Sequence, residues 1–152
     1  MGEAEVASFL AEERTLTCAT AGPRGWPHLM PLWYVLREAP QGEPGPRLWS
    51  WTYAASQKVR NLERDSRASV QVEAGELYNE LRGVLIVADT VIHRELELVT
   101  EFGLELFERY GTASYGPEYV EVVRGQAAKR VALQFVARRT MSWDHRKLGA
   151  VY

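Results

Sequence analysis

The sequence predicts a mainly β domain, an antiparallel β-barrel with peripheral helices. Six segments have the alternating or β-branched pattern of strands, and several of them are joined by turn-rich loops. Such hairpins and meanders favour an antiparallel barrel over a parallel sheet. The hydrophobic content of 46% is ample for one core, and 152 residues suit a single domain spanning 1–152.

The first half of the chain is predicted to combine strands with two short helices. Phe9 and Leu10 share a helical face, and Ser56 is a plausible N-cap for the second helix. Pro31 cannot donate to a β-ladder, so it should lie at an edge or a bulge, where backbone groups are free to meet a ligand. The predicted elements are a helix at 3–13, strands at 15–20, 26–37 and 47–53, and a helix at 56–65.

The second half is predicted to hold three strands and two helices. Residues 81–93 are a long β-branched run, and residues 95–110 place Phe102 and Leu106 on one helical face. Residues 130–143 resume the apolar strand pattern. The predicted elements are strands at 68–73, 81–93 and 130–143, and helices at 95–110 and 117–128.

Composition excludes several classes of function. The 18 basic and 20 acidic residues are scattered and give a net charge of −2, so neither nucleic acid nor a membrane surface is an expected partner. A single cysteine, Cys18, excludes an internal disulfide and fits a reducing compartment. No segment has the length of a membrane span or the pattern of a secretory signal. We therefore expect a cytoplasmic protein.

The segment WSWTYAASQKVRNL, residues 49–62, carries the clearest functional signal. Here a strand meets the start of a helix that bears a hydroxyl, Ser56, and a cation, Lys58. Free N–H groups at a helix start, a hydroxyl and an ammonium can converge on a phosphate. A helix start with an exposed lysine is the simpler alternative, and the residues alone do not decide between the two.

Four segments together resemble the pyridoxamine 5′-phosphate oxidase-like split-barrel superfamily, which includes FMN enzymes and F420-dependent reductases. They are GWPHLMPLW, WTYAASQKVRNL, DSRASVQVE and LRGVLIVADTVI, and the likeness spans about residues 5–145. The most specific part is the run matched by Thr52, Ser56, Lys58 and Leu62. The resemblance implies a six-stranded antiparallel split β-barrel that forms a homodimer, with the cofactor at the subunit interface.

The resemblance also implies the residues that contact the cofactor. Ser56, Gln57 and Lys58 would hold its phosphate. The backbone of Met30, Pro31, Leu32 and Trp33, with Trp51 and Thr52, would border the isoalloxazine ring or the ribityl chain. Arg60 is the best candidate for a further anionic contact, before Arg64 and Arg67, although such arginines often form a solvated helix face.

The chain departs from the vitamin-processing oxidases at two places. Met30 and Val35 stand about where those enzymes carry phosphate-binding basic residues, and TMSWDHRKLGAVY lacks their C-terminal segment for pyridoxal phosphate. These departures argue against pyridoxamine phosphate oxidation and favour the smaller reductase-like branch. Its cofactor would be FMN, with F420 as the alternative.

The predicted function is hydride transfer between this cofactor and a small unsaturated substrate. The chemistry would belong largely to the cofactor, so no catalytic residue is predicted. Cys18 and His93 are expected to be structural, and no metal site is expected. His28 and His145 have no decided role. Two alternatives remain: a non-catalytic carrier of a cofactor or a tetrapyrrole of the haem or biliverdin type, and a dimeric scaffold with an empty groove.

Overall fold

Strand pairing in the computed structural model, which describes residues 1–38, 47–111 and 116–149, closes a barrel in the order β1-β2-β3-β6-β5-β4. All neighbouring strands are antiparallel. The mainly β, six-stranded antiparallel fold predicted from sequence is therefore confirmed. The strands are β1 (Thr15–Ala21), β2 (Pro27–Arg37), β3 (Arg47–Tyr53), β4 (Arg67–Ala74), β5 (Arg82–His93) and β6 (Arg130–Asp144).

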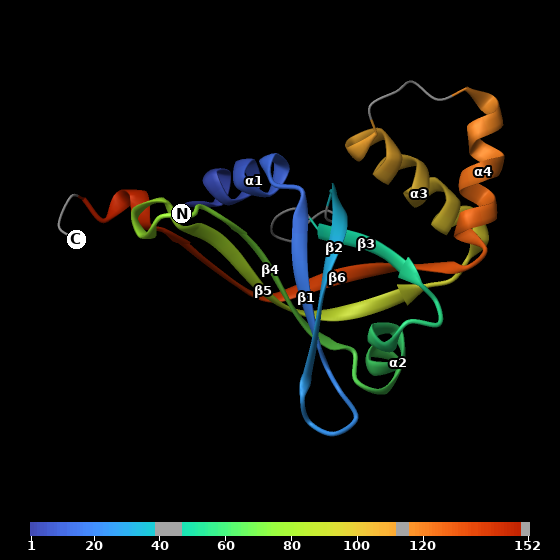
Figure 1. The fold of residues 1–152 in the computed structure, drawn as a ribbon, viewed down its shortest axis with the longest axis horizontal. Coiled ribbons are helices and arrows are strands. Elements are labelled where there is room, and N and C mark those ends of the chain that lie inside the picture. The colour runs from blue at the N-terminus through green and yellow to red at the C-terminus, as the bar shows by residue number, and fades with distance from the viewer. Residues whose placement is uncertain (39–46, 112–115, 150–152) are drawn as a thin grey trace.

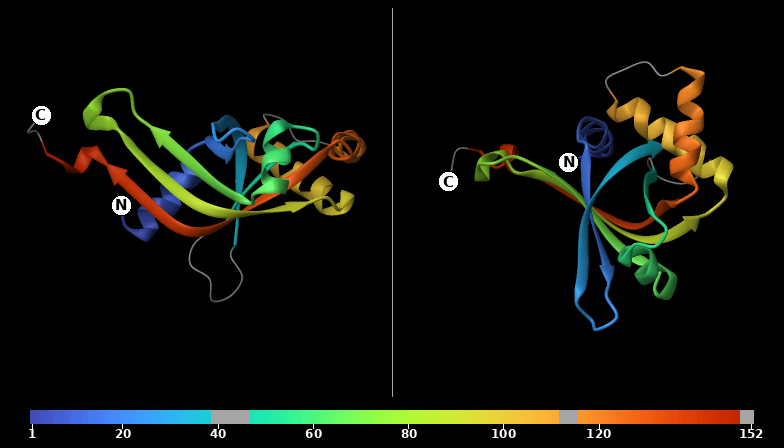
Figure 2. Two further views of the ribbon diagram at one scale, coloured as in Figure 1. Left: turned by 90° about the horizontal axis from the view of Figure 1, so that it is seen from below. Right: turned by 45° about the vertical axis from the view of Figure 1, so that its right-hand side comes forward.

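The helices lie outside the barrel at its ends and edges (Figure 1). α1 lies above the barrel, α2 lies below it at the end of β3, and α3 and α4 lie side by side above β3 and β6 (Figures 1 and 2). The long ends of β4, β5 and β6 extend away from the barrel as an arm. The helices are α1 (Glu3–Glu12), α2 (Gln57–Arg64), α3 (Leu96–Tyr110) and α4 (Pro117–Ala127), with 3-10 turns η1 (Tyr78–Glu80) and η2 (His145–Lys147) in the arm.

β2 pairs with a different neighbour in each part of its length. Residues 27–33 pair with β1, and residues 34–37 pair with β3. Pro31 therefore lies where β2 has one neighbour, as predicted for an edge proline. Among the described residues the backbone of 27–33 thus has an open side toward β3.

Two separate apolar cores hold the structure together. One fills the barrel, with Tyr34, Leu48 and Phe135 among its largest fully buried side chains. The other packs α3 against the outer face of β2, β3 and β6 through residues such as Trp49 and Phe102. This division follows from the alternation of side chains along a strand, which sends neighbouring residues to opposite faces.

Polar contacts tie α1 to the rest of the molecule. The Arg109 guanidinium, at the end of α3, donates to the carbonyls of Leu10, Ala11 and Glu13 at 3.1, 3.0 and 2.8 Å. The Tyr34 hydroxyl also donates to the Leu10 carbonyl, at 2.7 Å. These donors satisfy carbonyl groups that every helix leaves without partners at its C-terminus.

The predicted boundaries agree with the structure to within two residues at each end of the described elements. The turn-rich segment 39–46 lies outside the described residues. The irregularity in strand pairing lies between Val87 and Ala88 of β5, not at Pro31, which occupies a regular register opposite Thr17. None of the helices in the described part of the chain is long and apolar enough to cross a membrane.

Candidate phosphate site and its surroundings

α2 begins directly after the end of β3, and its start is fixed by backbone hydrogen bonds. The Ala54 N–H donates to the Lys129 carbonyl at 3.0 Å, and the Ser56 N–H donates to the Tyr53 carbonyl at 3.0 Å. Ser56 occupies the N-cap position, and the first turn of α2 follows. The first N–H groups of a helix have no partner within it, so this turn presents donors at a fixed place.

Ser56 has a feature that an ordinary N-cap lacks. Its hydroxyl makes no capping hydrogen bond to α2. The oxygen is nevertheless buried and has no partner among the described residues. Buried polar atoms are nearly always hydrogen-bonded, so an unpartnered hydroxyl at a helix start indicates a place for a ligand acceptor.

Lys58 is the second unusual group of α2. Its side chain is buried, with the residue 6% exposed. Its ammonium donates to the Thr52 hydroxyl at 2.9 Å, and among the described residues this is its one hydrogen-bond partner. Burial lowers the pKa of this ammonium, an effect that the neighbouring Cys18 partly opposes. A buried cation with no anion beside it is costly, and an anionic ligand would remove that cost.

The sequence predicted Gln57 as a third phosphate contact, and the structure gives it another partner. Its side-chain amide donates to the Asn61 carbonyl oxygen at 2.9 Å. The Asn61 amide in turn donates to the Thr20 hydroxyl at 3.0 Å. Asn61 is fully buried, and this chain of hydrogen bonds ties α2 to β1. Asn61 was missed by the sequence analysis, although a polar residue between Val59 and Leu62 on the buried helix face is a detectable signal.

The four predicted residues of β2 do not share one face of the strand. Met30 and Leu32 have the parity of Tyr34, which lies in the barrel core, whereas Pro31 and Trp33 have the opposite parity. All four belong to the segment with an open side toward β3. A ligand at this edge can therefore meet backbone N–H and C=O groups, as the prediction requires.

Trp51 and Thr52 are likewise separated by strand alternation. Thr52 is buried and holds the Lys58 ammonium. The Trp51 indole packs on the other face, edge-on to Phe107 with ring centroids 6.1 Å apart, and Arg130 lies 4.7 Å above it. The structure therefore joins Thr52 to Lys58, two residues after the N-cap Ser56, and places Trp51 against the α3 helix.

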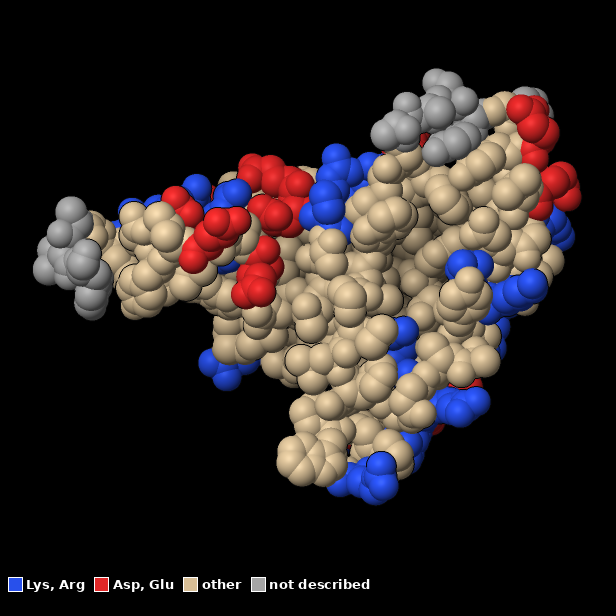
Figure 3. Space-filling view, in the orientation of Figure 1, with Lys and Arg blue, Asp and Glu red and all other residues tan. Residues whose placement is uncertain are grey.

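The three arginines of this region, Arg60, Arg64 and Arg67, differ in their hydrogen bonds and ion pairs. Arg64 donates to the Ala21 carbonyl, and Arg67 forms an ion pair with Asp65 at 2.7 Å. Arg60 is exposed. In the space-filling view, blue side chains collect on the side of the molecule that carries α2 and the start of β6, with few acidic residues among them (Figure 3). An anion approaching α2 meets a favourable field there.

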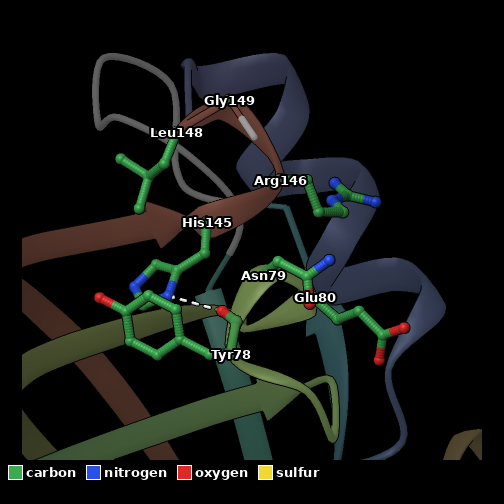
Figure 4. Close-up of a pocket in the computed structure, with 7 residues that line it drawn as sticks. All are labelled: Tyr78, Asn79, Glu80, His145, Arg146, Leu148 and Gly149. Carbon is green, nitrogen blue, oxygen red and sulfur yellow. Dashed lines mark hydrogen bonds between the residues drawn. The ribbon is translucent and has the colours of Figure 1, made fainter. Parts of the chain in front are cut away.

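A cavity lies in the arm, at the opposite end of the molecule from α2 (Figure 1), and Figure 4 shows its lining. Its volume is about 770 Å³. The rings of Tyr78 and His145 lie 4.6 Å apart, and the His145 Nδ1 is 2.9 Å from the Tyr78 carbonyl oxygen. Its lining residues come from η1, η2 and the residues that follow η2: Tyr78, Asn79, Glu80, His145, Arg146, Leu148 and Gly149. The described residues contain no group of three potential metal ligands.

Comparison with known proteins identifies the family. The family model described as pyridoxamine 5′-phosphate oxidase matches residues 3–143. The chain belongs to this family. Its split-barrel architecture, expected from the resemblance of four sequence segments, is thereby shown. No curated protein matches the chain.

Solved structures of the family share the fold. A conserved hypothetical protein of Mycobacterium tuberculosis, Rv2991, is 43% identical, with a TM-score of 0.87 over 100% of this chain and 90% of that one. A structure described as an F420 reductase is 21% identical, with a TM-score of 0.62 over 88% of this chain and 94% of its own. The haem storage protein HutZ of Vibrio cholerae is 18% identical, with a TM-score of 0.68 over 91% and 92% of the two chains. The fold is therefore shared with an F420 reductase and with a haem storage protein.

Proposed function

We propose that this protein is an oxidoreductase that uses a flavin-type cofactor to transfer a hydride to or from a small unsaturated substrate. FMN is the cofactor we favour, and F420 is the alternative. The observation that carries this proposal is the buried Lys58 ammonium, which has a neutral hydroxyl as its one partner among the described residues. Both cofactors have a phosphate that would supply the missing negative charge.

The chemistry of the donor groups fits a phosphate. Ser56 with its unpartnered hydroxyl, Lys58 and the first N–H groups of α2 all belong to one helix start, and the Lys58 ammonium is bonded to Thr52 at the end of β3. A phosphate has several acceptor oxygens and a charge that favours the positive end of the helix dipole. A neutral ligand would satisfy the hydroxyl but not the ammonium.

The chain would contribute binding and orientation around such a cofactor. Ser56 and Lys58 would hold the phosphate, and the open side of β2 would offer backbone groups to the polar edge of the ring. Trp33, which is 53% exposed, provides an apolar surface on the same strand. A bound flavin or deazaflavin supplies the hydride chemistry itself, so the proposal assigns no catalytic residue.

We further propose that the protein is a homodimer and that the second subunit covers the cofactor. An uncharged surface crosses the outer faces of β2, β1, β4 and β5. Strand register aligns Leu29, Ala19, Ser69 and Val87 in one row across it. The neighbouring row consists of Pro31, Thr17, Gln71 and Leu85. The centre of Figure 3, over β1 and β2, has the same uncharged character. An uncharged surface that mixes apolar residues with small and neutral polar ones is suited to a second copy.

The test of the cofactor is titration of the stripped protein with FMN and with F420. A charge-assisted hydrogen bond lost from a buried site weakens binding about 10- to 100-fold, and this is the effect expected for Lys58→Ala. Ser56→Ala should weaken binding less. Lys129→Ala, which removes an exposed ammonium, is the matched control. Unchanged affinity in Lys58→Ala, or a haem spectrum with no affinity for either cofactor, would refute the redox proposal.

The test of the dimer is the mass in solution. Ala19→Arg places a charge in the centre of the uncharged surface, whereas Ala128→Arg places the same charge on an exposed residue at the end of α4. Light scattering should give a dimer for the wild type and the control, and a monomer for Ala19→Arg. The monomer should also bind FMN more weakly. A monomeric wild type would contradict this part of the proposal.

A further inference from the structure

Tyr110, the last residue of α3, is held by an unusual number of contacts. Its hydroxyl accepts a hydrogen bond from the Tyr34 N–H at 3.0 Å. The same hydroxyl is 2.6 Å from the Tyr34 carbonyl oxygen and 2.8 Å from the Arg14 carbonyl oxygen, so it also donates to the backbone. Its ring lies 5.5 Å from the Arg14 guanidinium and 5.7 Å from that of Arg109. Tyr110 is therefore fixed against β2, the start of β1 and its own helix.

The Tyr110 ring supports Trp33. The two rings are nearly parallel, with an angle of 9° between their planes and 4.5 Å between their centroids. Trp33 is nevertheless 53% exposed. In addition, its carbonyl oxygen accepts a hydrogen bond from the Ser50 hydroxyl at 2.6 Å, which fixes the backbone beneath it. The result is an indole with one face covered by Tyr110 and much of its remaining surface in solvent.

We infer that the uncovered face of Trp33 is a stacking site for a planar conjugated ring, and that Tyr110 is the positioning residue that keeps this face correctly oriented. The inference rests on the proposed function, because the ring belongs either to the cofactor or to an aromatic substrate held against it. An immobilised indole loses little conformational freedom when a ligand stacks on it, which favours binding. Trp33 also lies on the open segment of β2, where the cofactor ring is proposed.

Other tryptophans do not offer the same arrangement. Trp49 is 8% exposed, with His93 stacked 4.8 Å away and Arg37 at 4.8 Å from its ring. Trp26 is 80% exposed and lies just after the turn between β1 and β2. Trp33 is thus both exposed and supported by a parallel ring, which makes Trp26 a suitable control for exposure without support.

The experiment compares five variants in FMN titrations followed by flavin fluorescence. Trp33→Leu and Tyr110→Leu remove the indole and its support, whereas Tyr110→Phe keeps the ring and loses the hydroxyl. Trp26→Leu controls for loss of an exposed indole, and Lys58→Ala reports on the phosphate site. A stacked aromatic pair corresponds to an affinity change of about 3- to 10-fold, the loss expected for Trp33→Leu. Bound FMN should be strongly quenched in the wild type and brighter in Trp33→Leu.

The positioning role of Tyr110 predicts how its two variants should differ in FMN affinity and in the fluorescence of bound FMN. Tyr110→Leu should raise the Kd and the fluorescence of bound FMN, as Trp33→Leu does. Tyr110→Phe should restore both values close to those of the wild type, because the parallel ring remains. Since Tyr110→Leu is the variant most at risk of unfolding, Trp33→Leu, which changes an exposed residue, keeps the inference falsifiable on its own.

A second titration separates the two sources of the ring. FMN-loaded protein is first reduced without oxygen by one equivalent of dithionite, so that no free reductant remains. The planar probe 2-methyl-1,4-naphthoquinone is then added, and its KM is taken as the concentration that gives the half-maximal rate of FMN reoxidation. If Trp33→Leu raises this KM and leaves the Kd of FMN unchanged, the stacking site serves the substrate. If the Kd of FMN rises, the site serves the cofactor. Both results support the inference.

Failure of this inference is distinguishable from failure of the proposed function. If Lys58→Ala weakens FMN binding while Trp33→Leu behaves like Trp26→Leu toward both FMN and the quinone, only the stacking site is refuted. If the wild type binds neither FMN nor F420, the proposed function fails. The quinone alone, titrated against tryptophan fluorescence, then tests Trp33. Quenching that Trp33→Leu abolishes supports the stacking site, and absence of binding refutes it.

Discussion

Replacing the buried Lys58 by methionine should stabilise the ligand-free protein while impairing cofactor binding. The two side chains have similar length and volume, so Lys58→Met leaves packing nearly unchanged and removes only the ammonium. A buried lysine can lose its proton in place of remaining charged. Neutralising a lysine with its ordinary pKa of 10.5 at pH 7 costs about 5 kcal/mol, so the cost of burying Lys58 cannot exceed this value. The substitution also leaves the Thr52 hydroxyl without its donor, which costs about 1–3 kcal/mol. We therefore expect a net gain of about 1–3 kcal/mol.

The assay is urea unfolding of stripped protein, followed by tryptophan fluorescence at fixed protein concentration. Lys129→Met is the matched control, because its side chain is exposed and its free energy of unfolding should change by less than about 0.5 kcal/mol. If Lys58→Met instead destabilised the ligand-free protein by more than about 1 kcal/mol, the ammonium would be well satisfied without a ligand. The argument for an anion site would then fail.

The pH dependence gives an independent check of the same reasoning. Because burial lowers the pKa of Lys58 in the folded state, the unfolded chain binds the proton more tightly. Stability of the ligand-free protein should therefore gain a contribution as the pH rises toward 10.5 and the lysine loses its charge. This contribution should be absent in Lys58→Met. Comparison of the two proteins removes the contributions of all other groups.

Three further predictions concern the framework of the site. Gly103→Ala should lower the free energy of unfolding by about 1–3 kcal/mol, because a Cβ there would overlap the Trp51 indole and lie 2.8 Å from Val123; a stabilised variant in thermal unfolding would contradict this. Cys18 should not react with a thiol reagent in the native protein, and its modification rate should follow global unfolding. Burial raises the pKa of Cys18 from 9.0 to about 12. The stability that comes from keeping this thiol protonated should therefore be complete below pH 9 and decline, by at most about 4 kcal/mol, as the pH rises toward 12. If the free energy of unfolding fell with pH equally steeply in the wild type and in a Cys18→Ala variant at alkaline pH, this prediction would be refuted.

Local patterns explain why the elements could be predicted from the sequence. The alternation in RLWSWTY and the β-branched run of residues 81–93 specify strands whatever their neighbours are. Ser56 at the start of an apolar helical pattern likewise predicted the beginning of α2. These signals depend on a few adjacent residues, and their predicted boundaries were correspondingly close.

Such local patterns could not predict contacts between segments that are far apart in the sequence. Nothing in the spacing of Trp33 and Tyr110 indicates that they stack, because their contact depends on how α3 returns over β2. The same holds for the buried state of Lys58, which arises when α2 folds against the end of the barrel. The sequence therefore indicated a phosphate site, and the physical argument for it, an ammonium without an anion, came from the structure.

The bonds between Arg109 and the end of α1 also affect how the protein is made. Arg109 follows Leu10 by 99 residues, so the ribosome releases α1 long before its anchor exists. A helix of 10 residues is barely stable alone in water. During synthesis the end of α1 must therefore wait for α3 before these three bonds can form, although α1 is the first element of the chain. Translation that stops before residue 109 also leaves out β6, so the barrel core that buries Phe9 and Leu10 is incomplete, which makes such a fragment a ready substrate for chaperones and proteases.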